Sequence, residues 1–174
     1  AGAGASGGTS NWSNGFLPSS YRGVVFRSQG DPVLNLGNPG GINRSDQSRS
    51  LDAIRRLNQQ RLSLTGDPEI ASRISAYELA FRMQTQAPEA FDLSRESQGT
   101  HKLYGLDHET TRDYGRQCLL ARRMVERGVR YVVANVGGQW DSHANVRDHE
   151  KVAATCDQPV AALLTDLKSR GLLD

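Results

Sequence analysis

The residues best suited to chemistry lie in the segment Trp140-Asp-Ser-His-Ala-Asn145. Asp141 offers a carboxylate oxygen and His143 an imidazole nitrogen, and both are ligand types that Zn²⁺ or a similar divalent ion takes. A third ligand would have to come from elsewhere in the chain. A second interpretation stays open, in which Asp141 and Asn145 cap the following helix and His143 forms local hydrogen bonds.

Two further acid-histidine groups repeat one tripeptide, Asp107-His-Glu109 and Asp148-His-Glu150. Both lie near expected helix starts, where acidic side chains are favoured by the helix dipole without any catalytic role. We therefore expect both to be capping or solvated residues. The sequence contains no G-x-S-x-G, P-loop or H-E-x-x-H motif, so the catalytic nucleophile stays unknown.

The two cysteines, Cys118 and Cys156, have no C-x-x-C spacing, which excludes a zinc ribbon and a disulfide-rich scaffold. Both fall on apolar faces of predicted helices. We expect two buried thiols, and a single bridge between them stays the alternative.

The elements that must position Asp141 and His143 come from the C-terminal half. Helical periodicity from Thr111 to Arg127 is followed by 130–136, a nearly continuous run of β-branched and apolar residues. Such a run is typical of a strand buried on both faces of a parallel sheet. The loop after it would lie at the carboxyl end of the strand, where ligands gather. A last helix is predicted over 147–170, kinked or restarted at Pro159.

The apolar and polar faces of these two helices follow from their spacing. The predicted buried residues of the first are Tyr114, Cys118, Ala121 and Val125, with Arg116, Arg123 and Arg127 opposite. The predicted buried residues of the second are Val152, Cys156, Val160, Leu163, Leu164 and Leu167.

The N-terminal half is predicted to be mostly helical after residues 1–45, which are Gly/Ser-rich loops with short strand-like pieces at 23–26 and 32–36. Gly2, Gly4 and Gly7 match G-x-G-x-x-G, but no strand precedes them and no apolar helix follows, which argues against a dinucleotide site. One helix is predicted over 46–62. A second starts at Asp67-Pro-Glu69 and ends before Pro88, and 88–109 is mostly irregular.

Composition limits the function. Hydrophobic residues make up 37% of the 174 residues and the net charge is +2, which permits a core and argues against a dedicated nucleic-acid binder. A mean hydropathy of −0.56 and the lack of a long apolar run exclude a membrane-spanning helix. The sequence predicts an α/β fold in one partial domain: loops over 1–45, a helical insertion over 46–110 and an α/β core segment over 111–174. It begins without a methionine or a signal peptide, and we expect a fragment.

Several runs together resemble one bacterial family, the sulfatase-like proteins grouped as domain of unknown function 1501. These runs cover 11–26, 75–84, 114–123, 126–131, 140–143 and 166–174. The resemblance extends over essentially the whole chain. It implies membership of the alkaline phosphatase and sulfatase superfamily, and hence part of a layered α/β sheet with a divalent-metal site at the strand carboxyl ends.

The resemblance also implies roles for residues. Asp141 and His143 match the place of an Asp/His metal pair, and Trp140 and Asn145 would shape the pocket. The metal would be Zn²⁺, Ca²⁺ or Mn²⁺, and the substrate a small-molecule or polysaccharide sulfate or phosphate ester. The superfamily's nucleophile and second metal pair would lie outside this chain, in the remaining parts of its full-length protein. Family members are commonly exported, which implies a periplasmic or secreted location.

Two functions follow as expectations. The first is a fragment of a metal-dependent sulfate or phosphate ester hydrolase, inactive as this isolated chain. The alternative is a non-catalytic exported binding or assembly protein, in which the helical region of about 46–127 binds a partner. No nucleic acid and no membrane span is expected in either.

Overall fold

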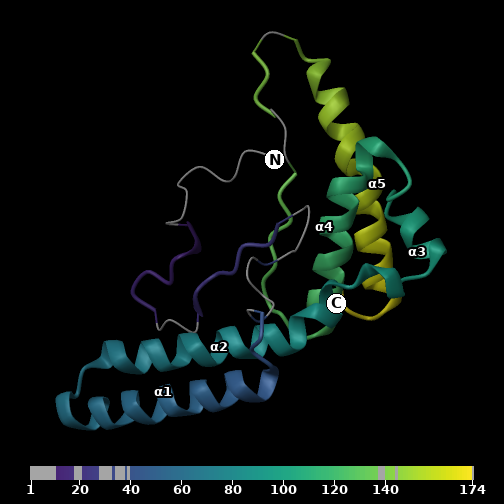
Figure 1. The fold of residues 1–174 in the computed structure, drawn as a ribbon. Helices are drawn as coiled ribbons and strands as arrows, with labels where there is room; N and C mark the ends of the chain where they lie inside the picture. The colour runs from purple at the N-terminus through teal and green to yellow at the C-terminus, as the bar shows by residue number, and fades with distance from the viewer. Residues whose placement is uncertain are drawn as a thin grey trace. The chain divides into compact units, whose positions relative to one another are not determined.

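The computed structural model describes residues 11–17, 21–27, 33, 38, 40–136, 140–143 and 145–173, with the backbone alone at 82, 83 and 85–87. Its elements are helices (Figure 1). In chain order they are α1 (Arg44–Thr65), α2 (Pro68–Phe91), the 3₁₀ helix η3 (Leu93–Arg95), α3 (Gln98–Leu103), α4 (Glu109–Glu126) and α5 (Asp148–Ser169).

The predicted α/β fold is wrong, because no described residue belongs to a strand. Residues 130–136 are extended, but no neighbouring segment forms backbone hydrogen bonds with them among the described residues. Val132, Ala134 and Val136 are half-buried, whereas Tyr131, Val133 and Asn135 are exposed. The run is therefore covered on one side only. Its β-branched residues set an extended backbone, but a strand also needs a partner.

The predicted strand over 23–26 is also wrong, because those residues have no regular structure. Most of the segment 32–36 and the glycines at 2, 4 and 7 lie outside the described residues.

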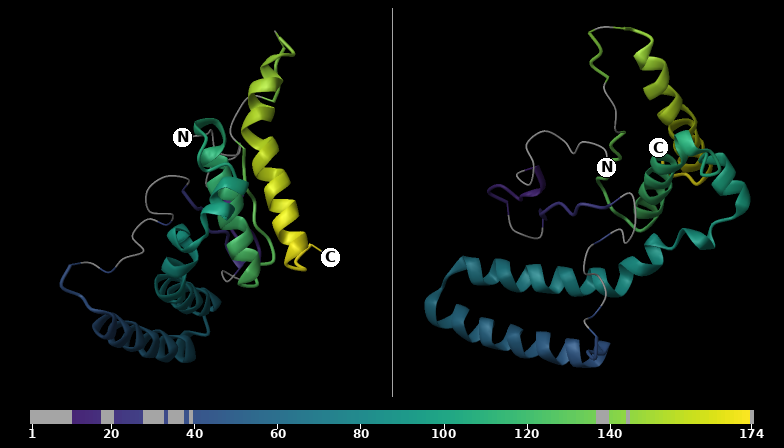
Figure 2. Two further views of the ribbon diagram at one scale, coloured as in Figure 1. Left: turned by 90° about the vertical axis from the view of Figure 1, so that its right-hand side faces the viewer. Right: turned by 45° about the horizontal axis from the view of Figure 1, so that its top comes forward.

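The described chain divides into two compact units. Unit 1 contains the described residues from Glu89 onward, and unit 2 contains the described residues up to Pro88. In unit 1, α4 and α5 pack side by side, as the two views of Figure 2 show. In unit 2, α1 and α2 run antiparallel.

The core of unit 1 lies between α4, α5 and the segment before α4. Its buried residues are Leu93, Tyr104, Tyr114, Cys118, Leu119 and Ala162. Ala134, Val136 and Cys156 pack against this core from the side. The predicted face of α4 is confirmed at Tyr114, Cys118 and Ala121. That of α5 is shifted, because Pro159, Ala162 and Asp166 are buried while Val160 and Leu164 are exposed.

Both prolines near predicted breaks lie inside helices. Pro88 does not end α2, which continues to Phe91, and Pro159 lies within the continuous helix α5. A proline removes one backbone donor and strains one turn, and packing offsets that cost at Pro159, a fully buried residue.

The hairpin of unit 2 follows from its capping residues. Asn43 accepts a hydrogen bond from the Asp46 amide (2.9 Å), and Gly66, the C-cap after the last residue of α1, has a φ of 66° that suits glycine. Asp67 then accepts from the Glu69 amide (2.9 Å) and starts α2 as predicted. No residue of α1 is buried, so local signals and not a core determine where this helix begins and ends.

Candidate functional site

The loop that precedes α5 brings the two predicted metal ligands together. Asp141 Oδ1 and His143 Nε2 lie 3.3 Å apart. Their side chains are 86% and 88% exposed, so both remain accessible to a ligand from solvent. A carboxylate and an imidazole at this separation suit two positions in the coordination shell of a divalent ion.

His149, on the first turn of α5, holds both ends of this loop. Its Nε2 lies 2.7 Å from the Trp140 carbonyl oxygen, and its Nδ1 lies 2.9 Å from the Val146 carbonyl oxygen. A carbonyl only accepts, so both contacts are hydrogen bonds only when the imidazole carries both protons. The hydrogen bond to the Val146 carbonyl, and to a smaller extent the one to the Trp140 carbonyl, raise the pKa of His149 above its ordinary value. The protonated form therefore closes the loop most tightly.

The predicted pocket residues have local partners. Asn145 Oδ1 accepts from the Arg147 amide (3.1 Å), and its carbonyl accepts from the Ser142 hydroxyl (2.9 Å). Asn145 thus shapes the turn into α5 but does not cap the helix, whose N-cap residue, Arg147, has no side-chain capping hydrogen bond. The Trp140 ring lies near the His149 ring, with centroids 6.4 Å apart. A role for Trp140 and Asn145 in a substrate pocket stays a prediction.

A third ligand is missing from this part of the chain. Among the described residues, no group of three or more His, Cys, Asp or Glu side chains is placed to hold a metal ion. Asp148, at the start of α5, accepts from Ser142 (3.1 Å) and pairs with Lys151 (3.8 Å). The Asp141–His143 pair therefore fits half of a metal site.

A charge cluster in unit 1, buried except at Glu126 and Arg170, is the main feature that the sequence did not predict. It consists of Glu96, Arg122, Arg123, Glu126, Asp166 and Arg170. Arg122 Nη2 lies 2.7 Å from Glu96, its Nη1 lies 2.7 Å from Glu126, and its Nε lies 3.2 Å from Asp166. Arg123, which was expected on the exposed face of its helix, also pairs with Glu96 and is buried.

The charge cluster is closed, because each of its three cations meets an acid of the same set. The Tyr104 hydroxyl adds a hydrogen bond to Asp166 (3.0 Å). Because each charge has an opposite partner in the set, the cluster joins α4 to α5 and to Glu96. Helical spacing gave no signal for the cluster, because two adjacent arginines on a helix can both face solvent beside an apolar stripe.

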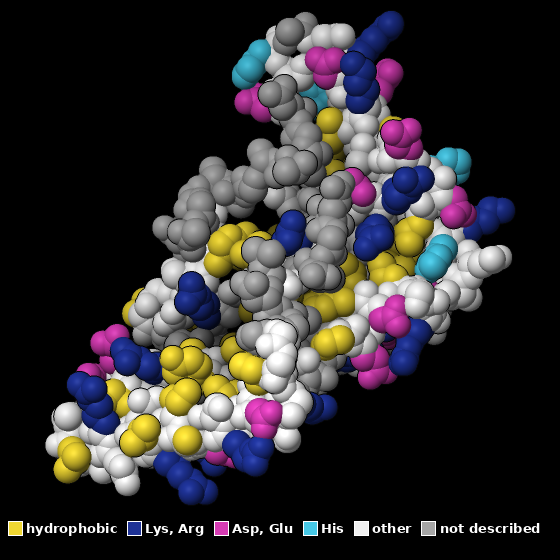
Figure 3. Space-filling model, viewed as in Figure 1, with side chains coloured by type: hydrophobic (Ala, Val, Ile, Leu, Met, Phe, Trp, Pro, Cys, Tyr) yellow, Lys and Arg dark blue, Asp and Glu magenta, His cyan; other side chains and the backbone are white. Residues whose placement is uncertain are grey.

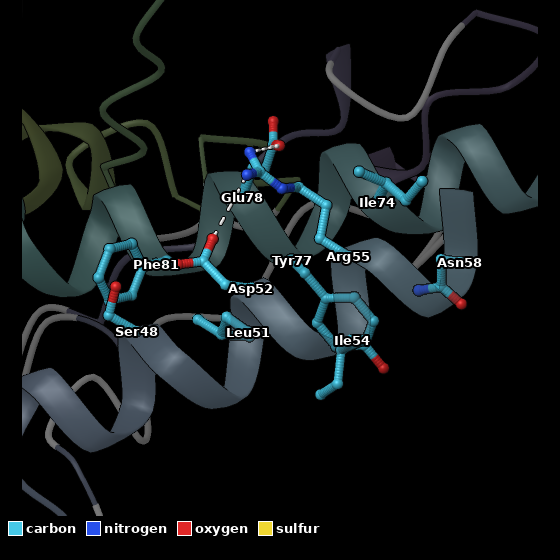
Figure 4. Close-up of a pocket in the computed structure, with 10 residues that line it drawn as sticks. All are labelled: Ser48, Leu51, Asp52, Ile54, Arg55, Asn58, Ile74, Tyr77, Glu78 and Phe81. Atoms are coloured by element: carbon cyan, nitrogen blue, oxygen red, sulfur yellow. Dashed lines mark ion pairs between the residues drawn. The ribbon is translucent and has the colours of Figure 1, made fainter. Parts of the chain in front are cut away.

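Unit 2 contains a groove between α1 and α2, with a volume of about 430 Å³. We call it the interhelical groove. It is lined by Ser48, Leu51, Asp52, Ile54, Arg55 and Asn58 of α1 and by Ile74, Tyr77, Glu78 and Phe81 of α2 (Figure 4). None of the predicted site residues lines it.

Within the described part of the chain, every helix is too short or too polar to cross a membrane, as the hydropathy predicts. Comparison with curated proteins and with solved structures found no match. One family model does match, and it covers residues 1–174. The chain therefore belongs to the family described as protein of unknown function (DUF1501).

Proposed function

We propose that this chain supplies part of a metal-dependent hydrolase of sulfate or phosphate esters, with Asp141 and His143 as ligands of one divalent ion. The observation that carries the proposal is the 3.3 Å separation of the Asp141 and His143 side chains at the solvent-exposed start of α5. The kinship with sulfatases and alkaline phosphatases, together with an exported location, belongs to the proposal and rests on the resemblance of sequence.

In this proposal the chain's own residues bind and orient. Asp141 contributes a carboxylate oxygen, and His143 contributes a ring nitrogen of the neutral imidazole, which is the form of histidine that binds a metal ion. His149 anchors the loop from both ends through the Trp140 and Val146 carbonyls. Trp140 and Asn145 would border the substrate. A bound divalent ion would polarise the ester oxygens and stabilise charge on the leaving group.

The test is isothermal titration of the chain with Zn²⁺, Mn²⁺ and Ca²⁺ separately. We expect one site for at least one of these ions, and affinity about tenfold or more lower in the Asp141→Ala/His143→Ala variant, because both donors are lost. The matched control is Asp107→Ala/His108→Ala, which removes another exposed acid-histidine pair. Unchanged binding in the first variant, or equal loss in both, would refute the metal site.

A second candidate function is a non-catalytic binding protein, and the interhelical groove favours it. The groove lies within the helical region where a partner site is expected, and neither Asp141 nor His143 lines it. Metal-free full-length protein that still binds a partner through unit 2 would favour this function over the hydrolase.

A further inference from the structure

His149, on the first turn of α5, contacts the chain on both sides of the Asp141–His143 pair. The Trp140 carbonyl oxygen lies 2.7 Å from His149 Nε2, and Trp140 directly precedes Asp141. The Val146 carbonyl oxygen lies 2.9 Å from His149 Nδ1, and Val146 comes after His143 in the chain. In Figure 3 histidine and acidic side chains reach the surface where α5 begins. One imidazole therefore joins the two ends of the segment that carries both predicted ligands.

A second contact fixes the middle of this segment. The hydroxyl of Ser142, the residue between the two predicted ligands, lies 3.1 Å from Asp148 Oδ2 on α5. The segment is thus held to α5 at its start, its middle and its end, whereas the Asp141 and His143 side chains stay exposed. A backbone fixed around two exposed donors is preorganised, so binding an ion there costs less conformational entropy.

The contacts of His149 depend on its protonation. The imidazolium donates from both ring nitrogens and can bond to both carbonyls at once. The neutral ring has a single N–H, so its second nitrogen would face a carbonyl oxygen lone pair with no proton between them. Loss of one proton therefore releases one end of the segment, whichever tautomer remains.

The groups around His149 favour the imidazolium. From the loop it meets the two carbonyl oxygens and the Trp140 ring, whose centroid lies 6.4 Å from its own. The charged group that acts on it is the carboxylate of Asp148, the residue before it on α5, and this carboxylate pairs in turn with Lys151 (3.8 Å). The Val146 carbonyl, the Trp140 carbonyl and then Asp148 raise the pKa of His149.

We propose that His149 is a positioning residue for the Asp141–His143 metal pair, and that its imidazolium form holds the loop in the shape that binds the ion. The inference rests on the proposed function and adds regulation to the same site. As pH rises, His149 passes one proton to solvent and no covalent bond changes. The loop then loses one of its two attachments to the His149 ring, and part of its affinity for the ion is lost with it.

The probe for the test is the metal ion alone, Zn²⁺, Mn²⁺ or Ca²⁺, added to the whole chain by isothermal titration. His149→Phe keeps a ring beside Trp140 and removes both donors. We expect its affinity to be about tenfold lower than that of the unsubstituted chain at about pH 7. The matched control is His108→Phe, because His108 is exposed at the start of α4 and makes no capping hydrogen bond, and its affinity should be unchanged.

The pH dependence separates positioning from a general structural role. Protonation of the ligands themselves affects both chains alike, so it cancels in the ratio of the two affinities. We expect the advantage of the unsubstituted chain over His149→Phe to shrink by about threefold or more between about pH 6.5 and about pH 9, as His149 loses its proton. A mere loss of packing would lower the affinity by the same factor at every pH. Circular dichroism checks that both variants keep their helices.

Nuclear magnetic resonance of the ring nitrogens follows His149 without any metal. The chain has four histidines, and the signals absent from His149→Phe belong to His149. We expect both nitrogens to carry protons at low pH and the midpoint of titration to lie above the ordinary 6.5. This measurement is independent of whether an ion binds.

Three results would overturn the positioning role and leave the metal site standing. They are equal affinity of the unsubstituted chain and His149→Phe, a ratio of affinities that is the same at every pH, and a His149 midpoint at or below 6.5. Absence of metal binding by the unsubstituted chain would instead refute the proposed function, and the positioning role with it, even with His149 titrating as expected. The two failures are therefore distinguishable.

Discussion

Arg122 is a charged side chain that is almost wholly removed from water and contacts three acids, Glu96, Glu126 and Asp166. Removing one partner of a buried ionic group leaves uncompensated charge in a poorly solvated place. We expect Arg122→Met to lower the free energy of unfolding by about 3–5 kcal/mol in urea titrations. Arg127→Met, at an exposed position of the same segment, should change it by less than about 0.5 kcal/mol. Similar losses in both would contradict a stabilising role for the charge cluster.

Glu96 makes the stability of unit 1 depend on pH. Burial alone would raise the pKa of Glu96, but hydrogen bonds from Arg122 and Arg123 outweigh burial and hold the pKa below its ordinary 4.5. A carboxylate with a lower pKa in the folded state stabilises the protein above the unfolded value, and that contribution is lost as pH falls through the folded value. Stability should therefore fall from about pH 5 downward. Urea titrations at successive pH values measure how the free energy of unfolding depends on pH. In Glu96→Gln this free energy should fall less steeply below about pH 5. A pH dependence equal to that of the unsubstituted protein would contradict this role of Glu96.

The two thiols should differ in reactivity. Cys118 is fully buried, and burial raises its pKa to about 11, whereas Cys156 is only half-buried. The thiolate is the reactive form, so iodoacetamide should modify Cys156 first and reach Cys118 only on unfolding. Peptide mass spectrometry over a time course measures the order. Cys118 labelled as fast as Cys156 would show that the α4–α5 interface opens readily.

At the level of single residues, the sequence predicts that Asp141 and His143 lie near each other, because only Ser142 separates them in a short loop. It could not place Arg122, Arg123 or Asp166 in one cluster. Asp166 is 44 residues beyond Arg122, and their contact depends on how α5 packs against α4. Charge pairing of this kind is a tertiary property that helical periodicity does not contain.

Helix α4 illustrates how one element depends on its neighbour. Gly115 lies in the middle of it, and a Cβ at this position would come within 2.2 Å of the Tyr104 carbonyl oxygen. Alanine is ordinarily the better helix former by about 0.5–1 kcal/mol. We expect Gly115→Ala to destabilise the protein instead, by about 1–3 kcal/mol, because backbone must move to relieve the contact.

Gly99→Ala in α3 is the control for Gly115→Ala. There the nearest atom to a new Cβ is the Ser97 hydroxyl oxygen at 3.5 Å, an ordinary contact. Thermal unfolding of both variants measures the difference. A melting temperature unchanged in Gly115→Ala would mean that α4 and the Tyr104 turn separate easily.

Elements were predictable where local signals act alone. The start of α2 at Asp67-Pro68 follows from capping, and the buried positions Tyr114, Cys118 and Ala121 of α4 follow from 3.6-residue spacing, and these are confirmed. Arg123, predicted on the polar face of α4, is buried instead. The end of α2 was not predictable, since Pro88 strains a helix without forbidding it. The predicted strand at 130–136 failed because apolar β-branched residues favour an extended backbone, while pairing depends on a second segment.

Across the whole molecule, the protection of backbone amides from hydrogen exchange should be uneven. Unit 1 has a buried core and the charge cluster, whereas α1 in unit 2 has no buried residue. Local opening free energy rises with buried contacts, so amides of α4 and α5 should exchange slowest with solvent deuterium and those of α1 fastest. Hydrogen exchange followed by mass spectrometry measures this directly. Equal protection of α1 and α4 would mean that the hairpin has a partner that covers it.

The closed charge cluster has a consequence for how this sequence can change over time. Three arginines and three acids balance one another, and four of them, Glu96, Arg122, Arg123 and Asp166, have side chains at most 10% exposed, so the loss of one of these four leaves an uncompensated buried charge. A single substitution there is costly, and a second one of opposite sign restores the balance. Related chains should therefore vary at positions 96, 122, 123, 126, 166 and 170 in opposite-charge pairs, or replace several of them together by apolar residues.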